Sequence, residues 1–123
     1  MNIIEVLKAL AHENRIRILN LLAKSKLCVC ELENIMQINQ SNVSRHLSKL
    51  KQANLIKGRK KAQWIYYHLN EKMLTEHKFI KLLIEDELDD FAEAREDLKR
   101  LEKYSDSSLS CETLPKSDLF SDQ

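Results

Sequence analysis

Residues that interrupt regular secondary structure are scarce in this chain, which has one glycine, Gly58, and one proline, Pro115, among 123 residues. Glycine and proline most often end helices and form tight turns, so we expect a mostly helical chain with short connections. The length fits one domain. No apolar run reaches the roughly 18 residues of a membrane span, and the N-terminal residues lack the basic and apolar regions of a signal peptide. We therefore expect a cytoplasmic protein with no membrane partner, whose three cysteines are reduced.

Apolar side chains recur every three or four residues along most of the chain, which is the period of an amphipathic helix. In the first half of the chain the segments with this period are 3–10, 16–23, 30–36 and 41–53. Ser41 is a good N-cap for the last of them. Two shorter segments, 55–57 and 64–69, are rich in β-branched and aromatic residues and predict a β-hairpin with a basic connection. The sequence therefore predicts four helices followed by a hairpin.

The last predicted helix runs from about residue 71 to residue 103 and has an apolar stripe with a spacing of three and four residues. The stripe comprises Ile80, Ile84, Leu88, Phe91, Ala94, Leu98 and Leu101. This is more than the core of a small domain usually takes from one terminal helix, so we predict that part of the stripe forms a homodimer interface. The residues assigned to that interface are Ile84, Leu88, Phe91 and Leu98. Packing within the same chain is the alternative.

The composition changes along the chain in a way that the net charge of +1 conceals. Between Asn34 and Asn70 there is no Asp or Glu, whereas the same stretch contains seven Lys and Arg residues. From Glu71 to the end, 15 acidic residues outnumber 8 basic ones, and from residue 105 a Ser- and Asp-rich segment without periodicity predicts a disordered tail. We therefore predict a domain at 1–104 and a tail at 105–123, with a basic segment typical of a phosphate-binding surface.

The acid-free segment has the element order of a winged helix-turn-helix, in which two helices joined by a short turn precede a hairpin with a basic tip. A helix fits the major groove of double-stranded DNA, and cations of the hairpin can lie against neighbouring phosphates. The candidate DNA-contacting residues are Gln40, Ser41, Asn42, Ser44, Arg45, His46 and Lys49 on the helix and Arg59, Lys60 and Lys61 in the hairpin. A helical hairpin of a structural protein could mimic part of this order, but the absence of acidic residues favours DNA binding.

Two cysteines, Cys28 and Cys30, precede the turn in a Cys-x-Cys arrangement, and thiolates are soft ligands that prefer soft ions. Trivalent arsenic or antimony takes three sulfur-type donors. Cys111, from the same subunit or across the dimer, is either the third donor or an idle cysteine, and a small thiol or water is the other alternative for the third position. Residues two apart on a helix point about 200° away from each other. Both thiols can therefore bind one ion only if the helix start, which lacks a Ser, Thr, Asp or Asn cap, unwinds. Lys24, Lys26 and the helix N-terminus are expected to lower the thiol pKa values. The alternative to a metal site is that the two cysteines are small buried hydrophobic residues of the core.

Four segments resemble the ArsR/SmtB family of metalloregulatory repressors: 9–19, 28–32, 40–47 and 64–67. The Cys-Val-Cys-Glu-Leu segment is most similar to the arsenite-sensing branch, although a third cysteine expected at position 33 is replaced by Glu33. The resemblance implies a mainly α-helical winged helix-turn-helix, with about five helices and a two-stranded wing, that forms a homodimer through its terminal helices. It also implies a repressor that releases its operator when As(III) or Sb(III) binds cysteine thiolates, with no catalytic cofactor.

Other interpretations of the Cys-x-Cys pair stay open. A repressor of the same fold could sense thiol oxidation or persulfides, or another thiophilic metal such as cadmium, lead or zinc, through the same thiols. A thiol oxidoreductase is a more distant alternative, because no strand–helix redox scaffold surrounds the pair and no base is placed for catalysis. We therefore expect that the protein is not an enzyme.

Overall fold

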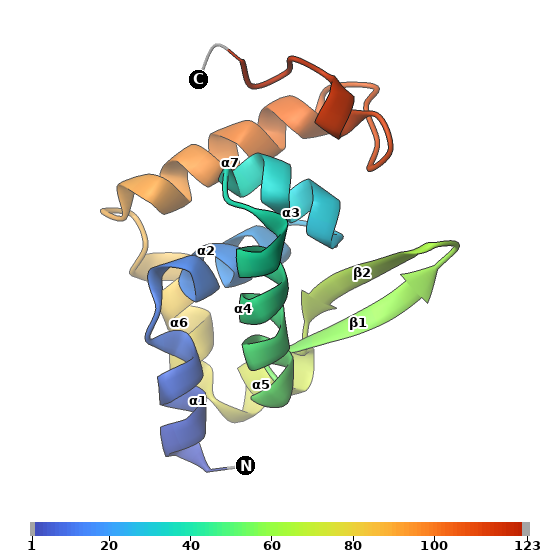
Figure 1. Cartoon of the computed structure of the whole chain (residues 1–123). Coiled ribbons are helices and arrows are strands. Elements are labelled where there is room, and N and C mark those ends of the chain that lie inside the picture. Colours follow the sequence, from blue (N-terminus) through green and yellow to red (C-terminus); the bar gives the residue numbers. More distant parts are fainter. Residues whose placement is uncertain (1, 122–123) are drawn as a thin grey trace.

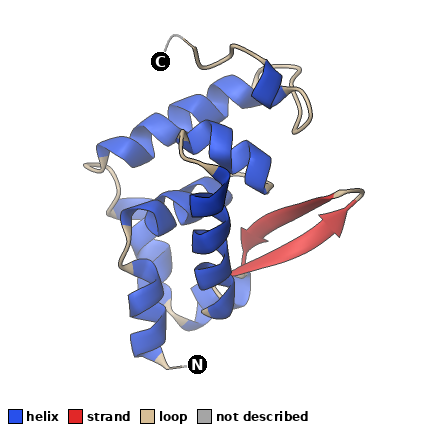
Figure 2. Cartoon of the chain, viewed as in Figure 1, coloured by secondary structure: helices blue, strands red, loops and turns tan. Residues whose placement is uncertain are grey.

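The computed structural model describes residues 2–121 as packed helices with one projecting β-hairpin (Figures 1 and 2). Within these residues the elements are α1 (Ile3–Leu10), α2 (Glu13–Leu22), α3 (Val29–Met36), α4 (Gln40–Gln52), β1 (Ile56–Lys61), β2 (Trp64–Leu69), α5 (Glu71–Glu76), α6 (Lys78–Asp86), α7 (Ala92–Ser105) and a short 3-10 helix, η1 (Leu114–Lys116). The mainly helical, winged architecture is confirmed, with seven α-helices in the described residues in place of about five. No helix among residues 2–121 is long and apolar enough to cross a membrane.

The core lies where α2, α3 and α4 pack together. Each of these helices contributes side chains with 0% exposure, namely Ile18, Leu21, Leu32, Ile35, Val43 and Leu50. α7 crosses α2 and α3, whereas α1 and α6 contact α2 at its other side (Figure 1). Because α4 buries one face in this core, its opposite face is fixed in an outward orientation.

The turn between α3 and α4 is made without glycine. α3 ends at Gln37, whose φ of 60° lies in the left-handed region. α4 begins directly afterwards, and the side chain of Asn39 accepts a hydrogen bond from the backbone N–H of Asn42 at 2.9 Å. Asn39 is therefore the N-cap, and the prediction that Ser41 caps this helix is wrong by two residues.

The hairpin is held at its base and closely packed along its length. A Cβ atom at Gly58 would lie 3.0 Å from a methyl group of Ile65 and 3.2 Å from the ring of Tyr67, so a larger residue at this position of β1 would displace these side chains by a few tenths of an ångström. Tyr67 also exchanges two backbone hydrogen bonds with Leu27, of 2.8 and 3.2 Å. These bonds tie the wing to the residue that precedes Cys28.

The prediction of one helix from about residue 71 to residue 103 is wrong, because the chain divides here into α5, α6 and α7. At His77 the backbone leaves the helical region, with φ −122° and ψ 81°, and residues 87–91 form a turn that redirects the chain. The predicted apolar stripe therefore does not share one face. Its members Ile80, Ala94 and Leu101 are buried in the core of the chain, and Ile84, Leu88, Phe91 and Leu98 are half-buried.

The structure differs from the expected disordered tail, because residues 106–121 fold back onto the domain. η1 contacts α3, and Cys111 and Leu114 are only 4% and 2% exposed. Further apolar side chains of this segment pack against the core, namely Leu109, Leu119 and Phe120. The segment is attached at separate points instead of along one face, so it shows no regular apolar period.

Candidate nucleic-acid interface and thiol site

α4 presents a polar and basic outer face. Its exposed side chains include Gln40, Ser41, Ser44, Arg45, Ser48 and Lys49. Asn42 is half-buried, and its Oδ1 accepts a hydrogen bond from the Arg45 guanidinium at 3.1 Å. This bond holds the guanidinium beside the first turn of the helix, where residues that enter a major groove are placed. The helix therefore offers donors and acceptors suited to base edges and phosphates.

The structure corrects the assignment of His46 as a DNA contact, because its side chain is turned into the protein. The residue is 2% exposed, and its ring lies 4.3 Å from that of His12, measured between centroids. Arg15 Nη1 lies 3.4 Å from its Nδ1, and within residues 2–121 its Nε2 has no hydrogen-bond partner. Burial, aided by the positive charges of His12, Arg15 and Arg45, lowers the pKa of His46 to about 4. The ring is therefore neutral at pH 7 and contributes to packing.

The wing carries its cations on both faces. Arg59, Lys60 and Lys61 are exposed on β1, and the hairpin projects away from the helices (Figure 2). Successive side chains of a strand point to opposite faces, so Arg59 and Lys61 share one face and Lys60 lies on the other. A phosphate backbone on either side of the wing therefore meets a positive charge.

The thiol site lies at the start of α3 and brings together the three cysteines. Cys28 is the N-cap of α3 and is 2% exposed; it forms a disulfide with Cys111, which is 83 residues further along the chain. Cys30 is a free, half-buried thiol that donates a hydrogen bond to the backbone oxygen of Cys111 at 3.0 Å. The structure thus differs from the expected set of reduced thiols and places the tail cysteine at the Cys-x-Cys pair.

The pKa of the Cys30 thiol is raised, mainly because burial disfavours the thiolate and further because Glu33 and Glu31 are negative neighbours. The expectation that nearby lysines lower the pKa is therefore wrong for this thiol. Protonated Cys30 can donate the hydrogen bond to Cys111, and it must lose that proton before it binds a metal ion.

Glu31 is a part of this site that sequence reasoning missed. Its Oε1 accepts a hydrogen bond from the backbone N–H of Cys28 at 3.0 Å, which supports a helix start whose N-cap side chain itself makes no capping hydrogen bond. Its Oε2 accepts a hydrogen bond from the hydroxyl of Tyr104 on α7 at 2.5 Å. A ligand atom of Glu31 lies within 4.8 Å of the sulfurs of Cys28 and Cys111. An acidic residue three positions after an N-cap was the available signal, because it is the pattern of a capping box.

The other end of α3 is held by a buried charge network. Arg17 of α2 donates to Asp97 of α7 at 2.7 and 2.8 Å and to the backbone oxygen of Met36 at 2.7 Å. Arg100 donates to Asp97 at 3.1 Å and to the backbone oxygen of Ile35. Asp97 is 0% exposed and raises the pKa of Arg17. α7 therefore contacts both ends of the helix that carries the thiols.

A winged helix-turn-helix with a basic outer helix defines a class of transcriptional regulators. Residues 12–57 match the family described as "Bacterial regulatory protein, arsR family". This match includes Cys28, Cys30 and the whole of α4, whereas Cys111 and α7 lie outside it. The chain belongs to the ArsR family.

Similar proteins support this placement. The arsenic resistance transcriptional regulator ArsR1 of Pseudomonas putida is 41% identical over 69 residues, which are 55% of this chain and 54% of that protein. The CadC homolog of Staphylococcus aureus, a cadmium resistance transcriptional regulatory protein, is 34% identical over 84 residues, 65% of this chain and 69% of that protein. A homodimeric winged helix-turn-helix DNA-binding domain from Mycobacterium bovis superposes with a TM-score of 0.60 at 26% identity, covering 70% of this chain and 81% of that one. The chain spans 54 to 63% of the length of the arsenic resistance relatives that it matches from Pseudomonas putida and Bacillus subtilis.

Proposed function

We propose that the protein is a dimeric transcriptional repressor that binds operator DNA and releases it when As(III) or Sb(III) binds the thiolates of Cys28, Cys30 and Cys111. The observation that carries the proposal is the meeting of these three cysteines at the start of α3, the helix that leads through a short turn into α4. Relatives named as arsenic resistance regulators support the choice of inducer.

The DNA-binding half of the proposal rests on the outer face of α4 and on the wing. Arg45 and its neighbours on α4 read bases in the major groove, whereas Arg59, Lys60 and Lys61 neutralise phosphates. Phosphate contacts supply most of the affinity and base contacts supply the sequence preference. His46 is not part of this surface, because it is buried.

The inducer-binding half requires the reduced form of the site, in which the sulfurs of Cys28 and Cys111 are free to act as ligands. Cys30 Sγ is not within the compact ligand cluster formed by Cys28, Glu31 and Cys111 in the described residues, so it must turn toward them to complete a three-sulfur site. Cys30 lies in the first turn of α3. Binding therefore distorts that turn and weakens the hydrogen bond from the Cys28 N–H to Glu31.

α3 transmits this distortion because it packs directly against α4. A ligand shifts an equilibrium only by its different affinities for the two forms, so arsenite must bind the free protein more tightly than the DNA-bound protein. Couplings of about 1–3 kcal/mol are usual and lower DNA affinity about 5- to 150-fold.

The homodimer is proposed through an apolar face formed by α1 and α6. Ile84 and Leu98, two of the residues predicted at the interface, pack against the core of their own chain. Large apolar side chains are exposed elsewhere, namely Ile3, Ile4 and Leu7 on α1 and Phe79 and Leu82 on α6. Ile3, Leu7 and Phe79 line one shallow pocket, so the two helices present them side by side. Contiguous exposed apolar surface of this kind marks protein–protein interfaces. Ile4→Asp would place a charge in this surface, so the variant should sediment as a monomer.

The experiment that tests the proposal is a titration of the reduced protein–operator complex with arsenite, antimonite, cadmium and zinc, followed by fluorescence anisotropy. Arsenite and antimonite should release the DNA from the wild type. Cys28→Ser and Cys30→Ser should bind DNA as well as the wild type and resist release. Cys111→Ser should bind arsenite more weakly and lose three-sulfur coordination in X-ray absorption. Release by arsenite that persists in the Cys28→Ser, Cys30→Ser double variant would contradict the sensor assignment.

The Cys28–Cys111 disulfide supports a second candidate function, in which oxidation of the thiols is the inducing signal. Hydrogen peroxide can take two electrons and two protons from the two thiols, which form the disulfide while the hydrogen peroxide is reduced to two water molecules. Cys30→Ser separates the two candidates, because this variant should lose the response to arsenite and keep the response to peroxide. Peroxide that has no effect on the metal-free complex would exclude the second candidate.

A further inference from the structure

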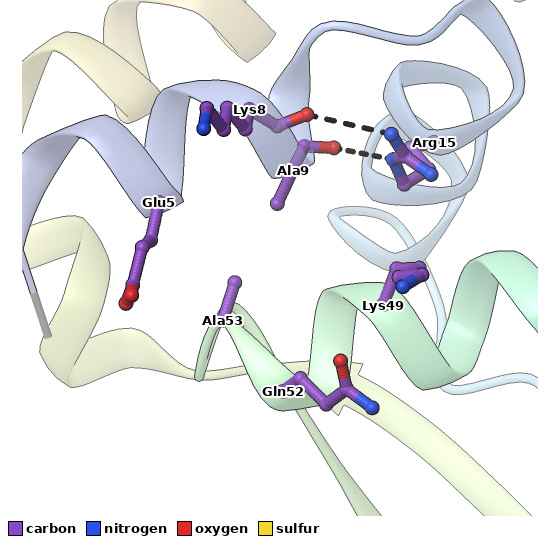
Figure 3. Close-up of a pocket in the computed structure, with 7 residues that line it drawn as sticks. All are labelled: Glu5, Lys8, Ala9, Arg15, Lys49, Gln52 and Ala53. Carbon is purple, nitrogen blue, oxygen red and sulfur yellow. Dashed lines mark hydrogen bonds between the residues drawn. The ribbon is translucent and has the colours of Figure 1, made fainter.

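A pocket of about 470 Å³ lies between α1, α2 and α4, beside the proposed DNA-reading face (Figure 3). Its lining residues are Glu5, Lys8, Ala9, Arg15, Lys49, Gln52 and Ala53. In this lining three basic side chains face one carboxylate, that of Glu5. The pocket therefore carries a net positive charge and suits an anion.

The charge of Arg15 is fixed in place. Its Nε donates to the backbone oxygen of Ala9 at 2.6 Å and its Nη2 to that of Lys8 at 3.4 Å, as Figure 3 shows. These carbonyl groups end α1, so Arg15 closes that helix and points its guanidinium along the pocket wall. Lys8 and Lys49 are exposed, and neither forms a salt bridge within residues 2–121. Their ammonium groups are free to bind an anion that the fixed Arg15 attracts.

The position of the pocket identifies the anion. Lys49 follows Arg45 by one helical turn on the outer face of α4, and Gln52 follows Lys49 by a further turn. α1 lies on one side of α4 and the wing lies on the other (Figure 1). A duplex placed over the outer face of α4 therefore has one phosphate backbone beside the wing and the other beside the pocket.

We propose that this pocket binds a backbone phosphate of the operator, on the side of the major groove opposite to the wing, with Lys8 and Lys49 as its ligands. The inference rests on the proposed DNA-binding function and deepens it, because it adds α1 to the DNA-contacting surface. The pocket on one side of α4 and the wing on the other then hold the two DNA strands, which fixes the depth and the angle at which the helix enters the groove.

The test measures operator affinity at several salt concentrations for Lys8→Gln and Glu5→Gln, with Lys103→Gln on the exposed side of α7 as a charge-matched control. Loss of one phosphate contact lowers the slope of log affinity against log salt concentration by about 0.9. The ratio of wild-type to Lys8→Gln affinity should therefore fall about threefold between 50 and 200 mM salt. Glu5→Gln should strengthen binding, because it removes the carboxylate from the pocket. Lys103→Gln should match the wild type.

Arg45→Ala separates a failure of this inference from a failure of the proposed function. A wild type without affinity for DNA would contradict the proposed function itself. If Arg45→Ala weakens binding while Lys8→Gln and Glu5→Gln keep the affinity and salt slope of the wild type, the phosphate pocket alone is wrong. A pocket for free phosphate would instead show as a rise in the Tm of the wild type, but not of Lys8→Gln, when inorganic phosphate is added, with DNA binding equal in both. That result would also overturn the assignment.

Discussion

The hydroxyl of Tyr104 in the last turn of α7 donates a hydrogen bond to Glu31 in the first turn of α3. Glu31 in turn accepts a hydrogen bond from the backbone N–H of Cys28. Tyr104, Glu31 and Cys28 therefore link α7 to the start of α3, which carries the thiols. Burial and the negative charge of Glu31 raise the pKa of Tyr104, which keeps its proton available for this bond. Neither of the two hydrogen bonds in this link involves a sulfur atom.

Tyr104→Phe should lower the free energy of unfolding by about 1–3 kcal/mol, because an oxygen of the buried Glu31 loses its donor while the aromatic ring is retained. Urea denaturation followed by circular dichroism measures the change. Tyr67→Phe is a matched control, since the Tyr67 hydroxyl has no hydrogen bond to residues 2–121. Equal stability of both variants would show that the Tyr104 bond contributes nothing to the position of α3.

Asp97→Asn should destabilise the protein by about 3–5 kcal/mol, because it leaves the buried guanidinium of Arg17 without its counter-charge. The side chain of Asp97 is 0% exposed, whereas that of Glu96 is 49% exposed and only forms a surface pair with Lys99 at 3.2 Å. Glu96→Gln should therefore cost less than about 1 kcal/mol in the same denaturation experiment. A similar small loss in both variants would contradict a structural role for the buried network.

His46 should make stability depend on pH between about 6.5 and 4. The pKa of His46 is about 4 in the folded protein and 6.5 as its ordinary value, so the unfolded chain binds more protons in this window. Stability is fully present above pH 6.5 and decreases as the pH falls toward 4, by about 2 kcal/mol between pH 7 and pH 5. Unfolding free energies at these two pH values, compared with those of His46→Gln, isolate the contribution. An equal decrease in the variant would assign the pH dependence to other groups.

Arg45→Ala and Lys60→Ala should weaken DNA binding in different ways. Loss of Arg45 should cost about 1–3 kcal/mol on the operator and reduce the preference for operator over unrelated duplex. Loss of Lys60 should weaken binding to both duplexes equally and lower the salt slope by about 1. Anisotropy titrations with both duplexes at several salt concentrations distinguish the two patterns, and the assigned surface is refuted if neither variant differs from the wild type.

Local sequence signals located most of the fold. The first four helices and the hairpin lie within a few residues of their predicted positions, because apolar period, caps and β-branched runs all act over short distances. The prediction of one continuous helix over 71–103 is wrong, although it rests on the same local signal, the apolar period. Its apolar spacing remains in phase across the turn at 87–91, so the period alone cannot reveal that the chain changes direction there.

The site was predicted only where its signals are local. The Cys-x-Cys pair and the exposed side chains of α4 follow from neighbouring residues, whereas the approach of Cys111 depends on how α7 crosses the domain. His46 was assigned to the surface on its polarity. Its spacing of three residues from Val43 and four from Leu50, both buried, was the better guide and places it on the inner face of α4.

The third cysteine is carried by a segment outside residues 12–57, the part that matches the family, whereas Cys28 and Cys30 lie inside it. Under the proposed function, inducer preference and operator preference are therefore encoded in stretches that can evolve separately. A descendant that loses Cys111 would keep its target genes and respond to arsenite more weakly.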